Sequence, residues 1–520
     1  MTSEKMGPNP IPSRGIRRRI AVLHRTLGLV LGPLVALWFV SGIGMMYTGG
    51  MPSLTPDLRL ERLPSLELTA VRQGPAEAYT RTGLNGAPSS VTLLSVLGRP
   101  AYRFNGSQGP SVFADDTTLV ETAGTREAVW VASLFAGVPV EAVTYDQLIS
   151  HADQWTIAQR RQLPLHRLRV DDGRGTVLYV SPGNAEVVQI TTRRSRALAW
   201  IAAIPHWLYL TPLRLREGLW RQLILWTAGI GSVLAVLGLT LAVVQFRVPR
   251  PVRLSHVRSY IPYAGWMRWH YLTGAVFGVL TFTWIFSGFL SMEPWGWASG
   301  EGLSSVPIRR ALAGEAVALE AIPSLQPAAL AAFLGEERLK EVSFGRVRGH
   351  PTLILRTSAD QGIQGVSILD RGSPRSAGRH ILDALSLRPI TSIPMDTLLG
   401  IVRATYPEIP IADAAVLHDY DSYYYSRDRS APLPVLRVRF DDADRTWMYL
   451  DPEAGTVAAA LHRLDRIERW IYSGFHSLDF NFWYRTRPAW DIAMIVLLLG
   501  GLTTTVIGFS LGLERIARKW

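Results

Sequence analysis

The sequence of 520 residues contains no cysteine and little charge. Without cysteine the chain cannot form disulfides, iron–sulfur clusters, thiolate nucleophiles or the covalent haem attachment of CxxCH proteins. A metal or redox cofactor would therefore be held by histidine, carboxylate, methionine or tyrosine. Charged residues make up 18% of the chain and hydrophobic residues 48%, and this balance predicts a membrane component.

Several common motifs are also missing. The sequence has no phosphate-binding loop, Rossmann fingerprint, serine or cysteine nucleophile motif, or HExxH. Direct hydride transfer from a nicotinamide is therefore excluded as an activity. The formal net charge of +12 comes from arginines that are spread along the chain and gather beside apolar stretches. This distribution indicates membrane topology and no nucleic-acid partner.

Four apolar stretches are long enough to cross a bilayer, which takes about 20 residues. They cover residues 27–47, 223–246, 272–292 and 492–513. The first follows a basic segment, as a signal peptide would, but it is longer than one and has no Ala-x-Ala cleavage site. We therefore interpret it as a retained anchor, and we expect the chain to lie in the lipid bilayer.

Short flanks rich in arginine set the predicted orientation, because such flanks stay in the cytoplasm. They precede the first span, fill the loop between spans two and three, and follow span four: Arg14, Arg17, Arg18, Arg19; Arg247, Arg250, Arg253, Arg258, Arg268; Arg515, Arg518, Lys519. Two long segments then lie outside. The predicted order is a tail 1–21, span 22–47, outer domain 48–198, interfacial segment 199–218, span 219–246, loop 247–268, span 269–292, outer domain 293–466, interfacial segment 467–489, span 490–513 and tail 514–520.

The two halves of the chain repeat one another. At an offset of 246, His24 matches His270 and Ser41-Gly42 matches Ser287-Gly288. At an offset of 270 the matches are Arg167/Arg437, Arg169/Arg439, Asp171-Asp172/Asp441-Asp442, Tyr179/Tyr449, Trp200/Trp470, His206/His476, Trp220/Trp490 and Gly238/Gly508. Because each unit has two spans, both copies enter the membrane from the same side. The sequence thus predicts two parallel repeats about a pseudo-two-fold axis along the membrane normal.

Each outer domain carries the pattern of an α+β fold with an antiparallel sheet. Alternating residues predict hairpins over 165–180 and 435–450, with the paired aspartates in the turns. Helical periodicity precedes each hairpin at 128–135 and 397–404, and earlier strands are predicted at 101–104 and 352–355.

Four histidines occupy matching places in the two units. His24 and His270 lie at the cytoplasmic edge of spans one and three, each with glycine four and eight residues later. Residues four apart share a helix face, so a flat macrocycle could lie in the groove, with its iron bound by imidazole. The alternative is that these glycines serve ordinary helix packing.

His206 and His476 lie at the opposite interface, in amphipathic stretches. Their alternative interpretation is a polar interfacial residue. The pseudo-two-fold axis, however, places each histidine opposite its match, which predicts two bis-imidazole sites at two depths.

Arginines near these histidines are candidate partners for haem propionates. They are Arg25 and Arg268 inside, and Arg485 and Arg487, together with Arg214 and Arg216, outside. In the second outer domain, Tyr423, Tyr424 and Tyr425 form a dense aromatic cluster that we consider as a substrate platform, with a tyrosine-rich edge strand as the alternative. The first copy has only a thin counterpart at 151–155.

These residues resemble the PepSY-associated transmembrane family, which includes ferrisiderophore reductases of the FoxB type and PiuB-like iron-uptake proteins. The resemblance rests on His24-Arg25-x-x-Gly28 leading to Ser41-Gly42, on the segment 434–442 with Tyr449-Leu-Asp-Pro, and on Arg469-Trp470 leading to His476-Ser-Leu-Asp. It covers nearly the whole chain. In the first copy, Ser181-Pro182 stands where the second has Asp451-Pro452, so the two outer domains are not expected to contribute equally.

The resemblance implies a PepSY-like domain in each unit and two haem b groups held by His24, His270, His206 and His476. It also implies a bacterial inner-membrane protein that reduces ferric iron in a siderophore at the periplasmic face. The electrons would come from a separate donor: a quinol, a soluble flavin reductase or a partner chain. Two other functions stay open from the sequence, a solute permease built from parallel repeats and a PepSY-anchored regulatory or binding protein.

Overall fold

The computed structural model describes residues 14–246, 261–300, 302–314, 319–322, 325–358, 378–390, 392–425, 431–484 and 486–518. The chain divides into two compact units. The membrane unit comprises Met1–Gly50, Leu198–Ser299 and Leu464–Trp520, and the sheet unit comprises Met51–Ala197 and Gly300–Arg463.

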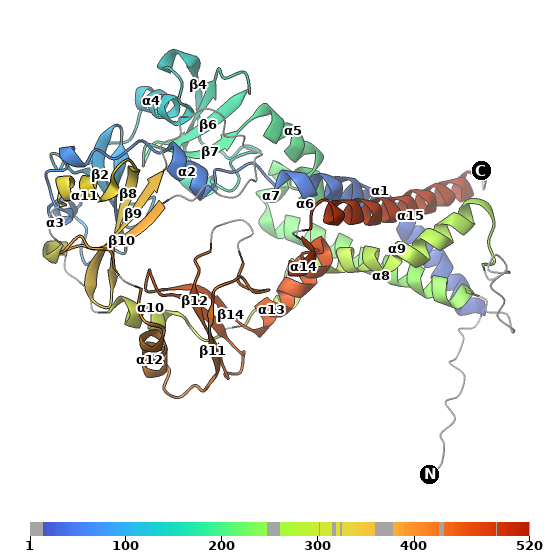
Figure 1. Ribbon diagram of the computed structural model, residues 1–520. Coiled ribbons are helices and arrows are strands. Elements are labelled where there is room, and N and C mark those ends of the chain that lie inside the picture. Colours follow the sequence, from blue (N-terminus) through green and yellow to red (C-terminus); the bar gives the residue numbers. More distant parts are fainter. Residues whose placement is uncertain are drawn as a thin grey trace, which may run out of the picture. The chain divides into compact units, whose positions relative to one another are not determined.

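Four long helices build the membrane unit: α1 (Arg14–Thr48), α8 (Glu217–Gln245), α9 (Gly265–Leu290) and α15 (Ala489–Ala517). Each is long and apolar enough to cross a membrane, as predicted for the four apolar stretches. In the bundle, α1 packs on α15, α15 on α9, α9 on α8, and α8 on α1 (Figure 1). Glycines bring the helices close together, because Gly500 and Gly501 of α15 leave room for the rings of Phe277 and Phe39.

Short helices precede α8 and α15, in the predicted interfacial segments. They are α5 (Arg193–Ile201), α6 (Ala203–Trp207) and α7 (Thr211–Arg214) before α8, and α13 (Arg463–Glu468), a π-helix (Arg469–His476) and α14 (Asn481–Tyr484) before α15. A tryptophan at the start of each long helix holds the preceding segment. The indole of Trp220 donates to the carbonyl of Trp207 at 2.9 Å, and that of Trp490 donates to the carbonyl of Leu478 at 3.1 Å.

Two four-stranded antiparallel sheets in the sheet unit follow one plan (Figure 1). One contains β4 (Val143–Ile149), β5 (Leu165–Val170), β6 (Thr176–Ser181) and β7 (Glu186–Thr191), with α4 (Thr125–Ala136) on its face; the other contains β11 (Ile411–Leu417), β12 (Val435–Phe440), β13 (Trp447–Asp451) and β14 (Thr456–Leu461), with α12 (Met395–Thr405). Both predicted hairpins are present. Asp172 and Asp442 accept hydrogen bonds from Thr176 and Thr446, as expected of turn residues.

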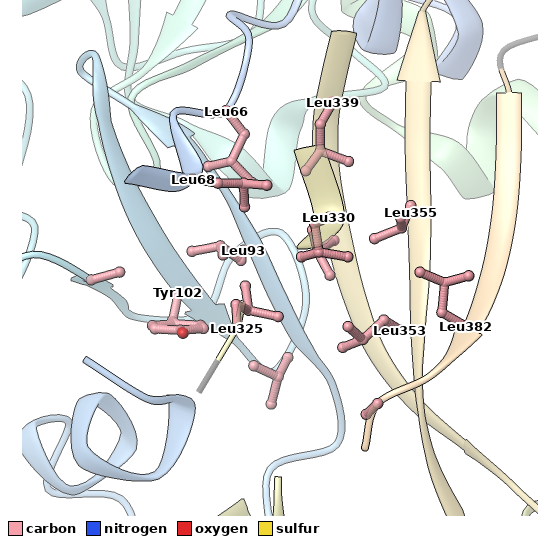
Figure 2. Close-up of a cluster of buried hydrophobic side chains, with 14 of the residues drawn as sticks. Leu66, Leu68, Leu93, Tyr102, Leu325, Leu330, Leu339, Leu353, Leu355 and Leu382 are labelled. Atoms are coloured by element: carbon pink, nitrogen blue, oxygen red, sulfur yellow. The ribbon is translucent and has the colours of Figure 1, made fainter. Parts of the chain in front are cut away.

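A six-stranded sheet takes three strands from each of the two predicted outer domains. Its order is β10 (Gly378–Asp383), β9 (His350–Ser358), β8 (Arg338–Val347), β1 (Val91–Val96), β2 (Arg99–Phe104) and β3 (Ser111–Phe113). Leucines from both sides of the junction form its core, including Leu93, Leu339 and Leu355 (Figure 2). Shorter helices complete the unit: α2 (Pro56–Arg62), α3 (Pro75–Arg81), α10 (Val306–Ala313) and α11 (Pro327–Leu334).

The central strand pair of this sheet is symmetric. Thr92 lies four residues before Val96 and Ser343 four residues before Val347, and each valine is followed by one residue and a glycine that turns the chain into the next strand. In the antiparallel register Thr92 is opposite Ser343, with Val91 opposite Phe344 and Leu93 opposite Val342. Equivalent residues of β1 and β8 therefore exchange places about a local two-fold axis at this pair.

A buried ion cluster spans the same junction. Glu186, 8% exposed, accepts from Arg59 at 2.9 Å and pairs with Arg103, while Arg59 also donates to Glu341 at 3.0 Å. Burial alone would raise the pKa of the Glu186 carboxyl, but attraction to Arg103 and Arg59 outweighs it and leaves that pKa below its usual value.

Candidate functional site

The first two histidines that the sequence predicts to face one another do so within the helix bundle. His24 of α1 and His270 of α9 have ring centroids 6.2 Å apart, with an angle of 37° between the ring planes. We call them the inner pair. His24 Nδ1 donates to the carbonyl oxygen of Leu234 at 3.1 Å, and His270 Nδ1 donates to that of Thr504 at 3.0 Å. The protonated nitrogen is thus Nδ1, and Nε2 keeps its lone pair.

A glycine explains why each imidazole reaches a carbonyl that already belongs to a helix. The Leu234 oxygen normally accepts from the amide of residue 238, and the Thr504 oxygen from that of residue 508. Both of these residues are glycine, and a Cβ at Gly238 or Gly508 would lie 2.8 or 2.5 Å from Cε1 of His24 or His270. The missing side chain uncovers the second lone pair of the carbonyl and gives the ring its place.

His206 and His476 form a second pair, the outer pair. Their ring centroids lie 6.1 Å apart, with an interplanar angle of 73°. The Nδ1 atom of His206 lies 3.1 Å from the hydroxyl of Ser41 on α1, and that of His476 lies 2.9 Å from the hydroxyl of Ser287 on α9. Among the described residues, no hydrogen bond involves Nε2 of any of the four histidines.

Local structure places each outer histidine. His206 lies in the one-turn helix α6, which is separated from α5 by the break at Ala202, whose φ and ψ are −111° and −79°. His476 ends the π-helix, a rare element that is frequent at functional sites. The ring of Tyr472 stacks on His476 with centroids 5.2 Å apart.

The ring separations match two imidazoles that share one metal ion. An imidazole nitrogen binds a metal at about 2 Å, and a five-membered ring with bonds of about 1.35 Å has a radius of about 1.15 Å. Two such rings on opposite sides of one ion have centroids about 6.3 Å apart by these values. The observed 6.2 and 6.1 Å fit this geometry, and the donor set of two neutral imidazoles is one that haem iron accepts.

The pairs lie at two depths of the bundle. His24 and Ser41, the contact of His206, are 17 residues apart on α1 (41 − 24), and His270 and Ser287 are also 17 apart on α9 (287 − 270). At 1.5 Å per residue this separation is about 25 Å. The buried rings of Phe39 and Trp284 meet edge-on between the two levels, with centroids 5.9 Å apart.

The glycines singled out after each inner histidine face other helices. A Cβ at Gly32 would lie 3.2 Å from Phe509, and a Cβ at Gly278 would lie 2.9 Å from Leu239. Their place is ordinary close packing, which was the alternative interpretation. An apolar groove of about 340 Å³ opens between α8 and α9, lined by Gly229, Ser232, Val233, Val236, Leu237, Phe282, Phe286 and Phe289, and no histidine lines it.

The arginines differ in their surroundings. Arg25 and Arg268 are half-buried and form no ion pair with a described residue. Arg487 is engaged: it pairs with Asp491 and lies over the ring of Trp490 at 4.2 Å. Arg485 lies outside the described residues. Arg214 is engaged in the same way: it pairs with Glu217 at 3.7 Å and lies over the ring of Trp220 at 4.3 Å, and its buried Nε has no hydrogen-bond partner in the described part of the chain.

The tyrosine cluster is partly structural. Tyr424 is 4% exposed, stacks on Tyr449 with centroids 4.7 Å apart and donates to the carbonyl of Pro432. It is a core residue, and its ring is not open to solvent. Tyr423 and Tyr425 are half-buried, and Tyr423 meets Trp447 edge-on at 5.2 Å.

Asp421 anchors that loop, because it accepts from the hydroxyl of Tyr449 at 3.0 Å and from Arg437 at 3.2 Å. In the first copy Asp153 likewise accepts from Tyr179 at 2.8 Å. The segment 151–155, which corresponds to the tyrosine-rich segment of the second copy, therefore has the aspartate but not the stacked tyrosine.

The sequence did not assign the residues that orient the imidazoles. The sequence shows four of these residues only as matches between its two halves: Ser41, Ser287, Gly238 and Gly508. Their duplication was the available signal, whereas the carbonyls of Leu234 and Thr504 carry no sequence signal at all.

Comparison with protein-family models gives no match to this chain, and no curated protein matches it either.

Proposed function

We propose that this chain is a transmembrane oxidoreductase that holds two b-type haems and passes electrons across a bacterial inner membrane to ferric iron in a siderophore or similar chelate. The observation that carries the proposal is the pair of facing imidazoles at each of two depths, with Nδ1 engaged and Nε2 free in all four histidines. A haem iron held at each site would supply one-electron chemistry.

The chain's own residues have separable roles in this proposal. The Leu234 and Thr504 carbonyls and the Ser41 and Ser287 hydroxyls fix the tautomer and orientation of the ligands. The apolar bundle excludes water and keeps the two sites in register through α1 and α9. Arg25 and Arg268 are available to neutralise propionates at the inner face, and Arg214, which also pairs with Glu217, at the outer face.

The proposal includes a tandem duplication with PepSY-like outer domains in the periplasm. Supporting it are the two four-stranded sheets of the same order, with a register shift at equivalent places, Tyr179/Val180 and Tyr449/Leu450. The same duplication relates the histidine contacts on α1 and α9. A chelate reduced on the outer side would release its iron, because hard oxygen donors hold the less charged ferrous ion poorly.

The experiment is a spectrum of the protein purified from membranes. The dithionite-reduced minus oxidised difference should contain b-type α bands equal to about two haems per chain. His24→Ala and His206→Ala should each remove one haem, a different one in each variant, whereas the exposed His418→Ala should retain both. A preparation without haem bands, or alanine variants that retain both haems, would refute the proposal.

A functional assay completes the test. With both haems reduced in the absence of oxygen, addition of a ferric hydroxamate should reoxidise them and produce ferrous iron that ferrozine captures. In His206→Ala the inner haem should still be present and reduced at the start, but its reoxidation by the ferric hydroxamate should be slower than in the wild type. Reoxidation at the wild-type rate in that variant would separate the haems from the reaction.

A further inference from the structure

Ser41 and Ser287 distinguish the outer pair from the inner pair. The inner imidazoles donate to main-chain carbonyls, which no substitution can remove, whereas each outer imidazole contacts a side-chain hydroxyl in addition to the carbonyl of Trp38 or Trp284. Both serines are 1% exposed. Each sits on a membrane-spanning helix, so it joins a ligand from a short interfacial helix to the rigid bundle.

The hydroxyl groups of both serines donate their protons within their own helices. Ser41 Oγ donates to the carbonyl of Leu37 at 2.7 Å, and Ser287 Oγ donates to that of Trp284 at 3.0 Å. A hydroxyl has one proton, so the oxygen that faces each histidine must accept from Nδ1–H. The carbonyls of Trp38 and Trp284 also lie beside these rings, and they too can only accept. These acceptors favour the tautomer that carries its proton on Nδ1.

We infer that Ser41 and Ser287 are positioning residues that orient the outer imidazoles and set the reduction potential of the metal between them. The inference rests on the proposed function. An acceptor at Nδ1 makes Nε2 a stronger donor, and a stronger donor favours the ferric over the ferrous ion. Loss of one hydroxyl should therefore raise the potential of the outer site and leave the inner site unchanged.

A matched control is present on α8. Ser232 is 8% exposed and donates to the carbonyl of Ala228 at 2.8 Å, one turn earlier in its own helix, as Ser41 does in α1. Its hydroxyl contacts no histidine. Ser232→Ala therefore reproduces the loss of a buried serine in a spanning helix without touching an imidazole.

The test is a spectroelectrochemical titration of the full-length protein and of the variants Ser41→Ala, Ser287→Ala and Ser232→Ala. Wild type should give two components, assigned with His24→Ala and His206→Ala. In Ser41→Ala and Ser287→Ala the reduction potential of the outer component should rise by about 59 mV. For a one-electron reaction this corresponds to an about tenfold weaker preference for the ferric over the ferrous state. Ser232→Ala should shift neither component.

Three results separate the possibilities. If Ser41→Ala and Ser287→Ala both titrate like wild type, or if the inner component moves instead, the inference is overturned while the two-haem proposal stands. If one variant fails to accumulate, the other still decides, because each serine contacts its own histidine. If wild type holds no haem, the proposed function itself fails.

Discussion

Adding one methyl group at Gly508 should remove the inner haem and spare the outer one. In Gly508→Ala the new Cβ would lie 2.5 Å from Cε1 of His270, and carbon atoms need about 3.5 Å. The ring must then retreat by about 1 Å, which would stretch its 3.0 Å hydrogen bond to the Thr504 carbonyl beyond the hydrogen-bonding limit of about 3.5 Å.

The expected size of the effect follows from what the ring loses. Removal of the group that orients a metal-bound histidine weakens metal binding by about 10- to 100-fold, or about 1.4 to 2.7 kcal/mol. Steric displacement adds to this loss, as in other overpacked sites. We therefore expect about one haem per chain, with the spectrum and potential of the outer site intact.

The assay is haem content and a potentiometric titration in detergent. Gly274→Ala is the matched control, because its Cβ would lie 3.6 Å from Thr504 Cγ2, an ordinary contact in the same bundle. Two unperturbed haems in Gly508→Ala would refute the reasoning, and so would equal losses in the Gly508 and Gly274 variants.

Further predictions concern both units. Gly238→Ala should repeat the inner-site loss in milder form, because the corresponding distance to His24 is 2.8 Å; haem content measures it. Glu186→Gln leaves Arg103 without its buried carboxylate, while Arg59 keeps its pair with Glu341, and should cost about 3–5 kcal/mol in the free energy of unfolding, seen as a lower melting temperature. Because the folded-state pKa of Glu186 is lowered, its stabilisation is complete above the unfolded value of about 4.3 and is lost as pH falls through the folded pKa; acid unfolding followed by tryptophan fluorescence should be less steep in the glutamine variant. Tyr424→Phe should cost about 1 kcal/mol of stability for the lost bond to Pro432 and leave chelate reduction at the wild-type rate; a slower reduction would restore Tyr424 to the substrate site.

The sequence predicts those helices and strands in which apolar residues recur at a regular spacing. The four apolar stretches and both hairpins came from hydrophobic patterning, and the boundaries differ by a few residues because basic flanks such as Arg14–Arg19 continue the helix α1. The facing histidines came from symmetry, since a duplicated chain places equal residues opposite each other.

What the sequence could not reveal depends on contacts between distant segments. No local pattern distinguishes Gly508, which makes room for His270, from Gly274, which faces Thr504. Nor does a run of tyrosines show which ring turns inward: Tyr424 is buried because it stacks on Tyr449 from another strand. The shared six-stranded sheet was also missed, because pairing between β1 and β8 joins residues about 250 positions apart.

The symmetric junction of β1 and β8 has a consequence for solubility. A strand at the edge of a sheet exposes unpaired amides and carbonyls that can pair with another chain, and this pairing promotes aggregation. Each of these strands would be such an edge if its half of the protein stood alone, and it would fit a second copy of itself in the same register. Because both strands belong to one chain, each supplies the other's partner from within, and neither strand lies at an edge of the folded sheet.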